Sequence, residues 1–255
     1  MITYQKFDLL FNKPIQLSKK VYVNVPTVEQ VCYEEDFTMY SSSVVRSTRE
    51  MFTPYREDLE KLSAKYPTIW SMIFDDEGDI IFGKINGFES GRNLVIDTLS
   101  YWTSLPKEDF EILVNSKKII NKKADWIIDE ETFNGVVELI KDLINYSENT
   151  DLIAPMNMSK RQEGIFYNMY KGRVRKLKKQ TGRTMADKIL ILQISMDSYI
   201  PMEEIRKMSI YHFNKLYESI ELKEAYNTQL QYKLSPKFDV KDEGGQKHWK
   251  ENVRM

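Results

Sequence analysis

"DEETFNGVVELIKDL" (residues 129–143) has the clearest periodicity in the chain and decides the fold. Asp129 precedes the first turn, where its carboxylate can accept hydrogen bonds from backbone N–H groups that have no partner inside a helix. Five apolar residues then recur at spacings of three and four, which is the period of one helix face; they are Phe133, Val136, Val137, Ile140 and Leu143. The stretch predicts an amphipathic helix that starts at Asp129.

The residues before this helix contain strand patterns. In "VYVNV" (21–25) the valines fall on one face while Tyr22 and Asn24 fall on the other, as in a strand. "NKP" (12–14) separates this run from the apolar "FDLLF" (7–11), so we predict a short N-terminal β-hairpin. Two or three further short strands are predicted between residues 110 and 128.

Helices are predicted between these strands. Thr27 followed by Gln30 fits a capping box, in which each side chain satisfies a backbone N–H of the other residue, so a helix should begin at Val28. Pro54, followed by acids in the first turn, indicates a second helix. Residues 94–103 are predicted to form a third.

After residue 143 the helical pattern continues. Ser159 and Gln162 form another capping box. The helix that follows has a predicted stripe of Phe166, Tyr170, Val174 and Leu177. Thr184 should start a buried helix, and Pro201 and Ser209 should start two more. The last of these carries Phe213 and Tyr217 on one face.

Together these patterns predict an α+β fold. A short N-terminal β-hairpin and a few strands are followed by a predominantly α-helical C-terminal half. We divide the chain into an α+β N-terminal region, 1–128, and a helical region, 129–255, with a polar tail from about residue 235.

The most basic segment is "KGRVRKLKKQTGR" (171–183), which has seven cationic side chains and no acid. The whole chain has a formal net charge of −1, which does not favour a dedicated nucleic-acid binder. Residues 1–158 carry 17 Lys plus Arg against 26 Asp plus Glu, whereas residues 159–255 carry 20 against 12. The basic segment closes the helix from Ser159, where the helix dipole stabilises cations. We interpret it as a solvated or partner-facing helix end.

The few cysteine and histidine residues of the sequence do not predict a metal site. Cys32 is the only cysteine, so no disulfide can form within the chain. His212 and His248 are the only histidines, and a zinc site would need both of them together with carboxylates. We therefore expect no metal and no cofactor.

Three glycine-containing segments match no common calcium-binding or phosphate-binding pattern. "DDEGD" (75–79) departs from the spacing of calcium-binding loops, and we interpret it as a tight acidic turn. "FGKIN" (82–86) and "GFESGR" (87–92) match neither common phosphate-binding pattern, and we interpret them as turns. No motif of nucleophilic catalysis occurs either, so we expect a protein without enzymatic activity.

No targeting segment is evident. The first residues lack the early positive charge and apolar block of a secretory signal. No run of about 18 apolar residues occurs, so we expect no membrane span and a cytosolic location.

Several stretches resemble tail assembly chaperones of long-tailed phages of Gram-positive hosts. They are "LLFNKPIQL", "VYVNVPTVEQV", "ETFNGVVELI", "MSIYHFNKLYESI" and "HWKENV". The resemblance implies a non-enzymatic protein in the cytoplasm of the infected bacterial host. It would coat the tape-measure protein and help to recruit tail-tube subunits. Two alternatives are a virion structural protein, such as a connector or tail-completion protein, and a DNA-binding regulator that uses residues 171–183.

The residues expected to contact partners lie on the helices between Ser159 and Gln231 and in the tail. On the helices they are Phe166, Tyr170, Lys171, Arg173, Arg175, Lys176, Lys178, Lys179, Phe213 and Tyr217. In the tail, Phe238 and Trp249 are expected to assist self-association.

Overall fold

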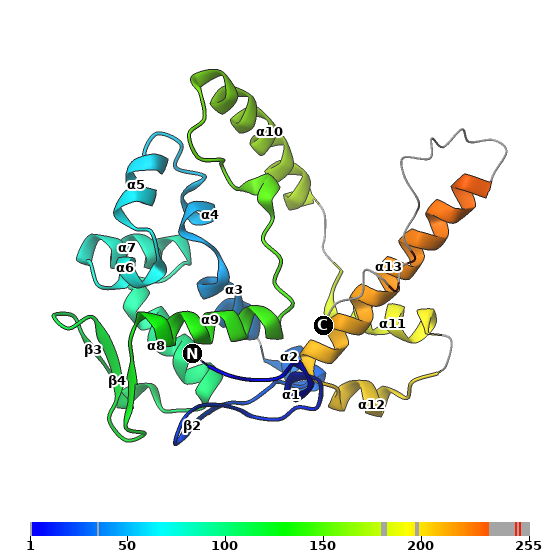
Figure 1. Cartoon of the computed structure of the whole chain (residues 1–255), viewed down its shortest axis with the longest axis horizontal. Coiled ribbons are helices and arrows are strands. Elements are labelled where there is room, and N and C mark those ends of the chain that lie inside the picture. The colour runs from blue at the N-terminus through cyan, green and yellow to red at the C-terminus, as the bar shows by residue number, and fades with distance from the viewer. Residues whose placement is uncertain are drawn as a thin grey trace. The chain divides into compact units, whose positions relative to one another are not determined.

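The computed structural model describes residues 2–34, 36–179, 183–196, 199–234, 248 and 250. It contains an N-terminal β-hairpin, a three-stranded sheet and a mostly helical remainder, so the predicted α+β class is confirmed (Figure 1). Two compact units are present. The first consists of Met1–Tyr4, Pro14–Asn24 and Glu34–Gly182, and the second of Gln5–Lys13, Val25–Tyr33 and Arg183–Met255. Our boundary after residue 128 rests on sequence pattern rather than on contacts, and it stays a prediction.

The predicted N-terminal hairpin is present in the first unit. Strands β1 (Ile15–Ser18) and β2 (Val21–Val23) pair antiparallel, with Ile15 opposite Val23. Both of these residues are buried.

The strand predicted at "FDLLF" was wrong, because the first four residues of this run lie in helix α1 (Lys6–Leu10) of the second unit and Phe11 is the C-cap of that helix. The Asp8 carboxylate accepts a hydrogen bond from the N–H of Gln5 (3.0 Å), which satisfies a backbone group at the helix start. A strand would place Phe7, Leu9 and Phe11 on one face. The helix instead places Leu9 on a different side from Phe7 and Phe11. Leu9 is therefore buried, whereas the two phenylalanines are exposed.

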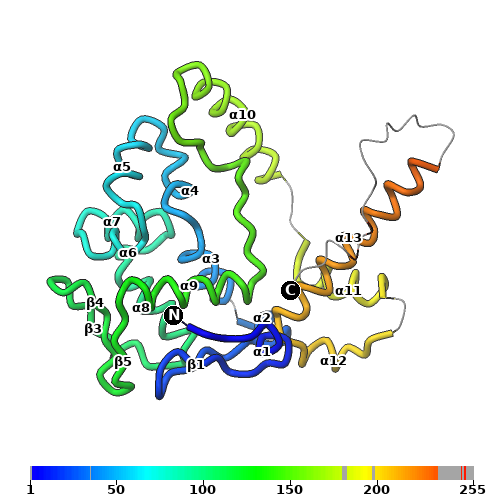
Figure 2. Tube along the Cα trace, viewed as in Figure 1, coloured from blue at the N-terminus to red at the C-terminus, as the bar shows by residue number. Residues whose placement is uncertain are grey.

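Short helices form much of the first unit (Figure 2). They are α3 (Asp36–Val45), α4 (Thr48–Phe52), α5 (Leu59–Lys65), α6 (Ile69–Ile73), α7 (Asp76–Ile85) and α8 (Gly91–Thr103). The helix predicted at 94–103 is confirmed within α8. The helix predicted from Pro54 begins later, at Leu59, because backbone hydrogen bonds from Tyr55 and Asp58 close turns before it.

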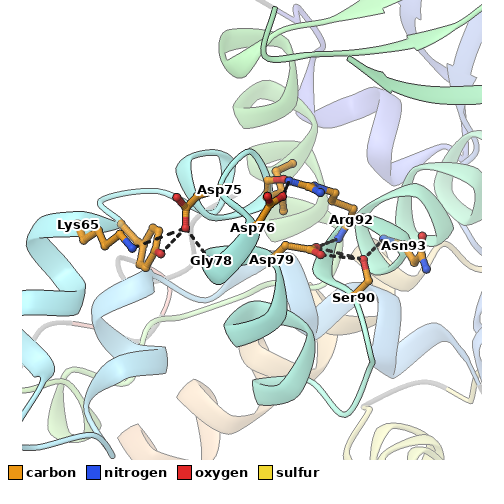
Figure 3. Close-up of polar contacts among 10 residues, drawn as sticks. Lys65, Asp75, Asp76, Gly78, Asp79, Ser90, Arg92 and Asn93 are labelled. Carbon is orange, nitrogen blue, oxygen red and sulfur yellow. Dashed lines mark hydrogen bonds and ion pairs between the residues drawn. The ribbon is translucent and has the colours of Figure 1, made fainter. Parts of the chain in front are cut away.

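The acidic segment 75–79 starts helix α7, so its interpretation as a tight turn was wrong. Asp75 is the N-cap and accepts hydrogen bonds from the Gly78 N–H (2.9 Å) and the Tyr66 hydroxyl (2.5 Å) (Figure 3). Acids in a first turn are stabilised by the positive end of the helix dipole, which suits this segment to a helix start.

Asp79 connects the end of this segment to helix α8. Its buried carboxylate accepts hydrogen bonds from the Ser90 hydroxyl and from the Arg92 N–H (2.6 Å) at the start of α8 (Figure 3). A Cβ at Gly91 would lie 2.6 Å from a ring carbon of Phe82, so glycine permits this close packing. The first four residues of "FGKIN" end α7, and Asn86 is the C-cap in a turn. "GFESGR" runs into α8, so the turn interpretation holds only for Asn86 and for the start of the second segment.

The predicted short strands form one antiparallel sheet in the order β3 (Phe110–Leu113), β4 (Lys118–Asn121), β5 (Trp126–Ile128). A 3-10 turn, η1 (Lys107–Asp109), leads into it. Helix α9 (Glu130–Leu143) follows and packs against β5 and α3. The Asp129 carboxylate accepts a hydrogen bond from the Thr132 N–H (2.9 Å), and all five residues of the predicted stripe are buried. The prediction for 129–143 is confirmed.

The second unit joins the start of the chain to its later helices. It contains α1, α2 (Val28–Tyr33), α11 (Met185–Ser195), α12 (Met202–Lys207) and α13 (Ile210–Leu234). The N–H of Val28 donates to the Met208 carbonyl (2.9 Å), and the N–H of Ile210 donates to the Pro26 carbonyl (2.9 Å). The capping box between Thr27 and Gln30 is confirmed. N-terminal residues therefore complete the packing of α12 and α13.

Helix α11 is capped as predicted, since Thr184 accepts a hydrogen bond from the Asp187 N–H (3.1 Å). The prediction that it is buried was wrong. Within its described residues only Leu192 is buried, whereas Leu190 and Ile194 are exposed. The apolar sequence of α11 therefore did not suffice to predict burial, because burial also requires neighbouring elements that cover the helix.

Candidate functional site

Helix α10 (Lys160–Lys179) is the longest helix of the first unit and carries the basic segment as far as Lys179. The Ser159 N–H donates to the side-chain oxygen of Gln162 (2.9 Å), and the Gln162 N–H donates to the Ser159 hydroxyl (3.4 Å). The predicted capping box is therefore confirmed. The described helix ends at Lys179, so the stop predicted at residues 181 and 182 lies outside the described residues.

Few contacts fasten α10 to its unit. Tyr167 is only 6% exposed, and its hydroxyl donates to the Thr53 carbonyl (3.1 Å). Arg56 pairs with Glu163 (2.6 Å) and also lies over the Tyr167 ring. The predicted stripe is only partly correct, because Tyr167 is the buried residue of the described helix and Leu177 is 45% exposed.

The aromatic residues predicted on this helix form a small cluster. Phe166 stacks on Tyr170 with ring centroids 5.9 Å apart, and it meets Tyr167 edge to face at 5.2 Å. Phe166 and Tyr170 are half-buried. Burial raises the pKa of Tyr170, with a smaller contribution from the Glu50 carboxylate, so its hydroxyl remains protonated at neutral pH. The cluster supports the middle of the helix.

The predicted cations divide into two groups. Arg173 pairs with Asp151 (3.0 Å) and donates to the Asp151 carbonyl (2.7 Å). The other five are exposed, and within the described part of the chain they have no ion-pair partner; they are Lys171, Arg175, Lys176, Lys178 and Lys179. Their charges are therefore available to a partner.

The basic excess of residues 159–255 comes almost wholly from this helix. Residues 159–182 contain eight Lys plus Arg and one acid, whereas residues 183–255 contain twelve against eleven. Arg183, the last cation of the basic segment, belongs to the second unit and pairs with Glu221 (3.0 Å). The predicted charge asymmetry is thus concentrated in α10.

A groove of about 400 Å³ lies along α10. It is lined by Pro155, Met156, Asn157, Met158, Gln162, Ile165, Phe166, Met169 and Arg173. Ile165 and Met169 are 52% and 50% exposed, and Met156 is more exposed still. Such an exposed cluster of methionine and aliphatic side chains is typical of surfaces that bind other proteins, because methionine adapts its shape to a partner.

The loop on one side of the groove is held in place by Arg49. The Arg49 side chain is 16% exposed. Its guanidinium donates hydrogen bonds to the carbonyls of Ala154 and Pro155 and forms an ion pair with Glu60 (2.7 Å). The Ala154 N–H donates to the Thr53 hydroxyl (3.1 Å). In the chain, this loop follows a 3-10 turn, η2 (Thr150–Leu152). The groove therefore has a positioned wall before any partner binds.

This groove was not among the predicted sites, although two of its lining residues, Phe166 and Arg173, were predicted as contact residues. Our other site residues on α10 were aromatic and cationic side chains that do not line it. A sequence signal was present, because "APMNM" (154–158) supplies two methionines just before a helix with Ile165 and Met169 four residues apart.

Other predicted contact residues lie elsewhere. Phe213 is fully buried and stacks on Tyr217 with ring centroids 6.5 Å apart, inside the second unit. Both rings therefore support α13 in this structure, and we leave them out of the candidate surface. Phe238 and Trp249 lie outside the described residues.

Among the described residues, no three His, Cys, Asp or Glu side chains gather closely enough to hold a metal ion. His212 is half-buried, and burial lowers its pKa. The pKa of the Cys32 thiol is raised by desolvation and by Glu29, which keeps it protonated at neutral pH. Among the helices that the structure describes, no segment combines the length and the hydrophobicity of a membrane span.

One comparison with known proteins gives a match. Residues 176–254 match the family model of the YomV second domain, a phage-associated family. The matched segment begins in the last turn of α10 and includes α11, α12 and α13. No curated protein and no solved structure matches the chain. This part of the chain is therefore similar to a domain of a phage-associated family.

Proposed function

We propose that this chain is a non-enzymatic phage protein that works by binding another protein during assembly of the virion. The observation that carries the proposal is the positioned apolar groove beside α10, next to a row of exposed cations. The segment that matches a phage-associated family supports the phage setting.

Within this setting, we propose the function of a tail assembly chaperone. The resemblance in sequence implies that such a protein coats the tape-measure protein and recruits tail-tube subunits in the cytoplasm of the infected host. A groove with apolar lining suits a partner helix, since an amphipathic helix places its apolar face into such a groove. The exposed cations of α10 would attract acidic residues at its edge.

Co-expression with the tape-measure protein of the same phage tests this function. The tape-measure protein should co-purify with the tagged chain at micromolar concentration, and tail-tube protein should join the complex when it is added. Replacing Arg49 with Ala should weaken the complex, because the loop that forms one wall of the groove loses its anchor. Absence of any complex at micromolar concentration would rule out the function.

The same phage setting also fits a virion structural protein, such as a connector or tail-completion protein. Mass spectrometry of purified particles separates the two functions. A chaperone that acts only during assembly should be absent from the particles, whereas a structural protein should be present in a fixed number of copies.

The five exposed cations between residues 171 and 179 favour one further candidate, a DNA-binding regulator. Binding to phosphates would release counterions, so the affinity for duplex DNA would fall steeply as salt rises. A mobility-shift titration at two salt concentrations tests this directly. We expect no salt-dependent shift, since the most exposed apolar residues of the groove beside the cations, Met156, Ile165 and Met169, would gain nothing from contact with a phosphate backbone.

A further inference from the structure

One face of α10 continues from the groove to the cationic end of the helix. Its residues follow each other at spacings of four, three, four and three, which keeps them on one side of an α-helix. They are Ile165, Met169, Gly172, Lys176 and Lys179, and we call them the groove face. All five are exposed.

The groove face changes character along its length. Ile165 and Met169 form its first part and line the groove. Lys176 and Lys179 form its last part. At a rise of about 1.5 Å per residue, the step from Met169 to Lys176 is about 10 Å. An apolar contact region and a cationic one therefore succeed each other along a single face.

Gly172 lies between these two regions. A Cβ built at this position meets no atom within 4 Å, so the backbone is open to the outside. Glycine costs stability in the interior of a helix compared with alanine. A glycine on an exposed helix face allows a second helix to approach the backbone closely.

We propose that the groove face binds an acidic amphipathic helix of a partner protein. Apolar residues of that helix contact Ile165 and Met169, its acidic residues pair with Lys176 and Lys179, and the two helices cross at Gly172. The inference rests on the proposed function in one respect, namely that α10 is a protein-binding surface. It adds the charge of the partner, its secondary structure and its position on the helix.

Charge complementarity is the reason to assign an acidic partner. Residues 159–182 contain eight cations and one acid, and Lys176 and Lys179 have no ion-pair partner in the described part of the chain. An apolar region beside these cations favours a helix over a nucleic acid, because a phosphate backbone would gain nothing from Ile165 and Met169. An extended polar peptide would also leave the groove unfilled.

A display library of 18-residue helical peptides is a suitable probe. Each position on one peptide face is drawn from Leu, Gln, Lys and Glu, and the library is selected on the immobilised full chain. We expect enrichment of peptides with two leucines three or four residues apart and glutamates seven to eleven residues further along. Enrichment of lysines, or of sequences without this charge preference, would overturn the inference.

The best peptide is then labelled with fluorescein, and its affinity is measured by fluorescence anisotropy. Met169→Asp should weaken binding about tenfold or more, since it places a charge in the apolar contact region. The double variant Lys176→Glu, Lys179→Glu should weaken it by about tenfold, and less at high salt.

Lys171→Glu, Lys178→Glu is the matched control for the lysine pair. It changes the same net charge on the same helix, but these two lysines lie on the side away from the groove face. Binding should change by less than about threefold. Equal effects of the two double variants, together with displacement of the peptide by a 20-base-pair DNA duplex, would show a general anionic surface and overturn the inference.

Substitution of Gly172 gives a test whose result cannot be explained by a loss of folding. Gly172→Ala should raise the helix stability and still weaken peptide binding, because the methyl group stands between the two helices. Gly164→Ala is the control, since a Cβ there also meets no atom within 4 Å but points away from the groove face. It should leave binding unchanged. Unchanged binding by the Gly172 variant would remove the proposed crossing point.

The outcomes separate this inference from the proposed function. A peptide that binds as described, with a tape-measure protein that does not co-purify, would support the inference and rule out the tail chaperone. A tape-measure complex that is insensitive to Met169→Asp would support the chaperone and rule out the groove face as its site.

Discussion

Helices α9 and α10 show how similar sequence signals lead to different structural roles. Each begins with a side-chain cap and carries apolar residues at helical spacing. In α9 every residue of the predicted stripe is buried, whereas the one buried residue of the described α10 is Tyr167. Periodicity predicts which face is apolar, but neighbouring elements decide whether that face is covered.

The neighbours differ for a physical reason. Helix α9 packs against β5 and α3, which supply two apolar surfaces. Helix α10 is attached through Tyr167, two ion pairs and the loop that Arg49 fastens. A covered stripe stabilises the fold, and an uncovered one leaves apolar surface for a partner.

Truncation of one stripe residue in each helix should give the largest difference. Ile140→Ala in α9 removes a fully buried side chain and should lower the free energy of unfolding by about 3 kcal/mol, because it leaves a cavity. Leu177→Ala in α10 should change it by less than about 0.5 kcal/mol, since Leu177 is already exposed. Urea denaturation measures both, and equal losses would contradict the comparison.

Removal of the loop anchor should have the next largest effect. Arg49→Ala leaves two carbonyls without their donor and should cost about 2 kcal/mol, the range for hydrogen bonds to a charged group. Amide hydrogen exchange should quicken around residues 154–158. Arg56→Ala is the control, since its ion pair with Glu163 is half-exposed and should cost under about 1 kcal/mol.

The N-cap of α9 gives a smaller, pH-dependent effect. Hydrogen bonds from Thr132 to the Asp129 carboxylate lower the pKa of Asp129 below its ordinary value of 3.8. The charged cap therefore stabilises the fold fully above 3.8, and this contribution is lost as the pH falls through the lowered pKa.

Asp129→Ala should cost about 1 kcal/mol at neutral pH. Asp129→Asn keeps a capping oxygen and should cost less. Urea denaturation from pH 7 downward should show the advantage of wild type over the Asn variant shrinking below pH 3.8. A constant advantage at every pH would show that the charge of Asp129 contributes nothing.

Glycines offer the smallest expected effect and the sharpest contrast. Gly164→Ala in α10 should raise the free energy of unfolding by about 0.5–1 kcal/mol, because its Cβ meets open space. At Gly135 in α9 a Cβ would lie 3.1 Å from the Ile2 side chain, so the gain should be smaller. Thermal unfolding of the two variants compares them, and a larger gain at Gly135 would contradict the packing described for α9.

Local signals in the sequence located several elements well. The caps at Thr27, Asp129, Ser159 and Thr184 were all predicted, because each pairs a short polar side chain with a partner three residues later. "FDLLF" was misassigned because five residues with apolar ends fit both a strand and a helical turn. The exposure of Leu190 and Ile194 on α11 could not be predicted from the local sequence either.

The candidate site was only half predicted. The exposed cations of α10 were identified, since a run of like charges is visible in the sequence. The groove depends on Arg49, which lies more than 100 positions before the carbonyls that it binds. Phe213 and Tyr217 looked like contact residues until the packing of the second unit buried them.

The sequence by itself determined the caps, the apolar faces and the concentration of positive charge, because each depends on residues a few positions apart. The tertiary structure decided which faces are covered, because burial depends on what the rest of the chain brings to them. It buried the stripe of α9, left Ile165 and Met169 exposed beside a positioned loop, and joined the first residues of the chain to α12 and α13.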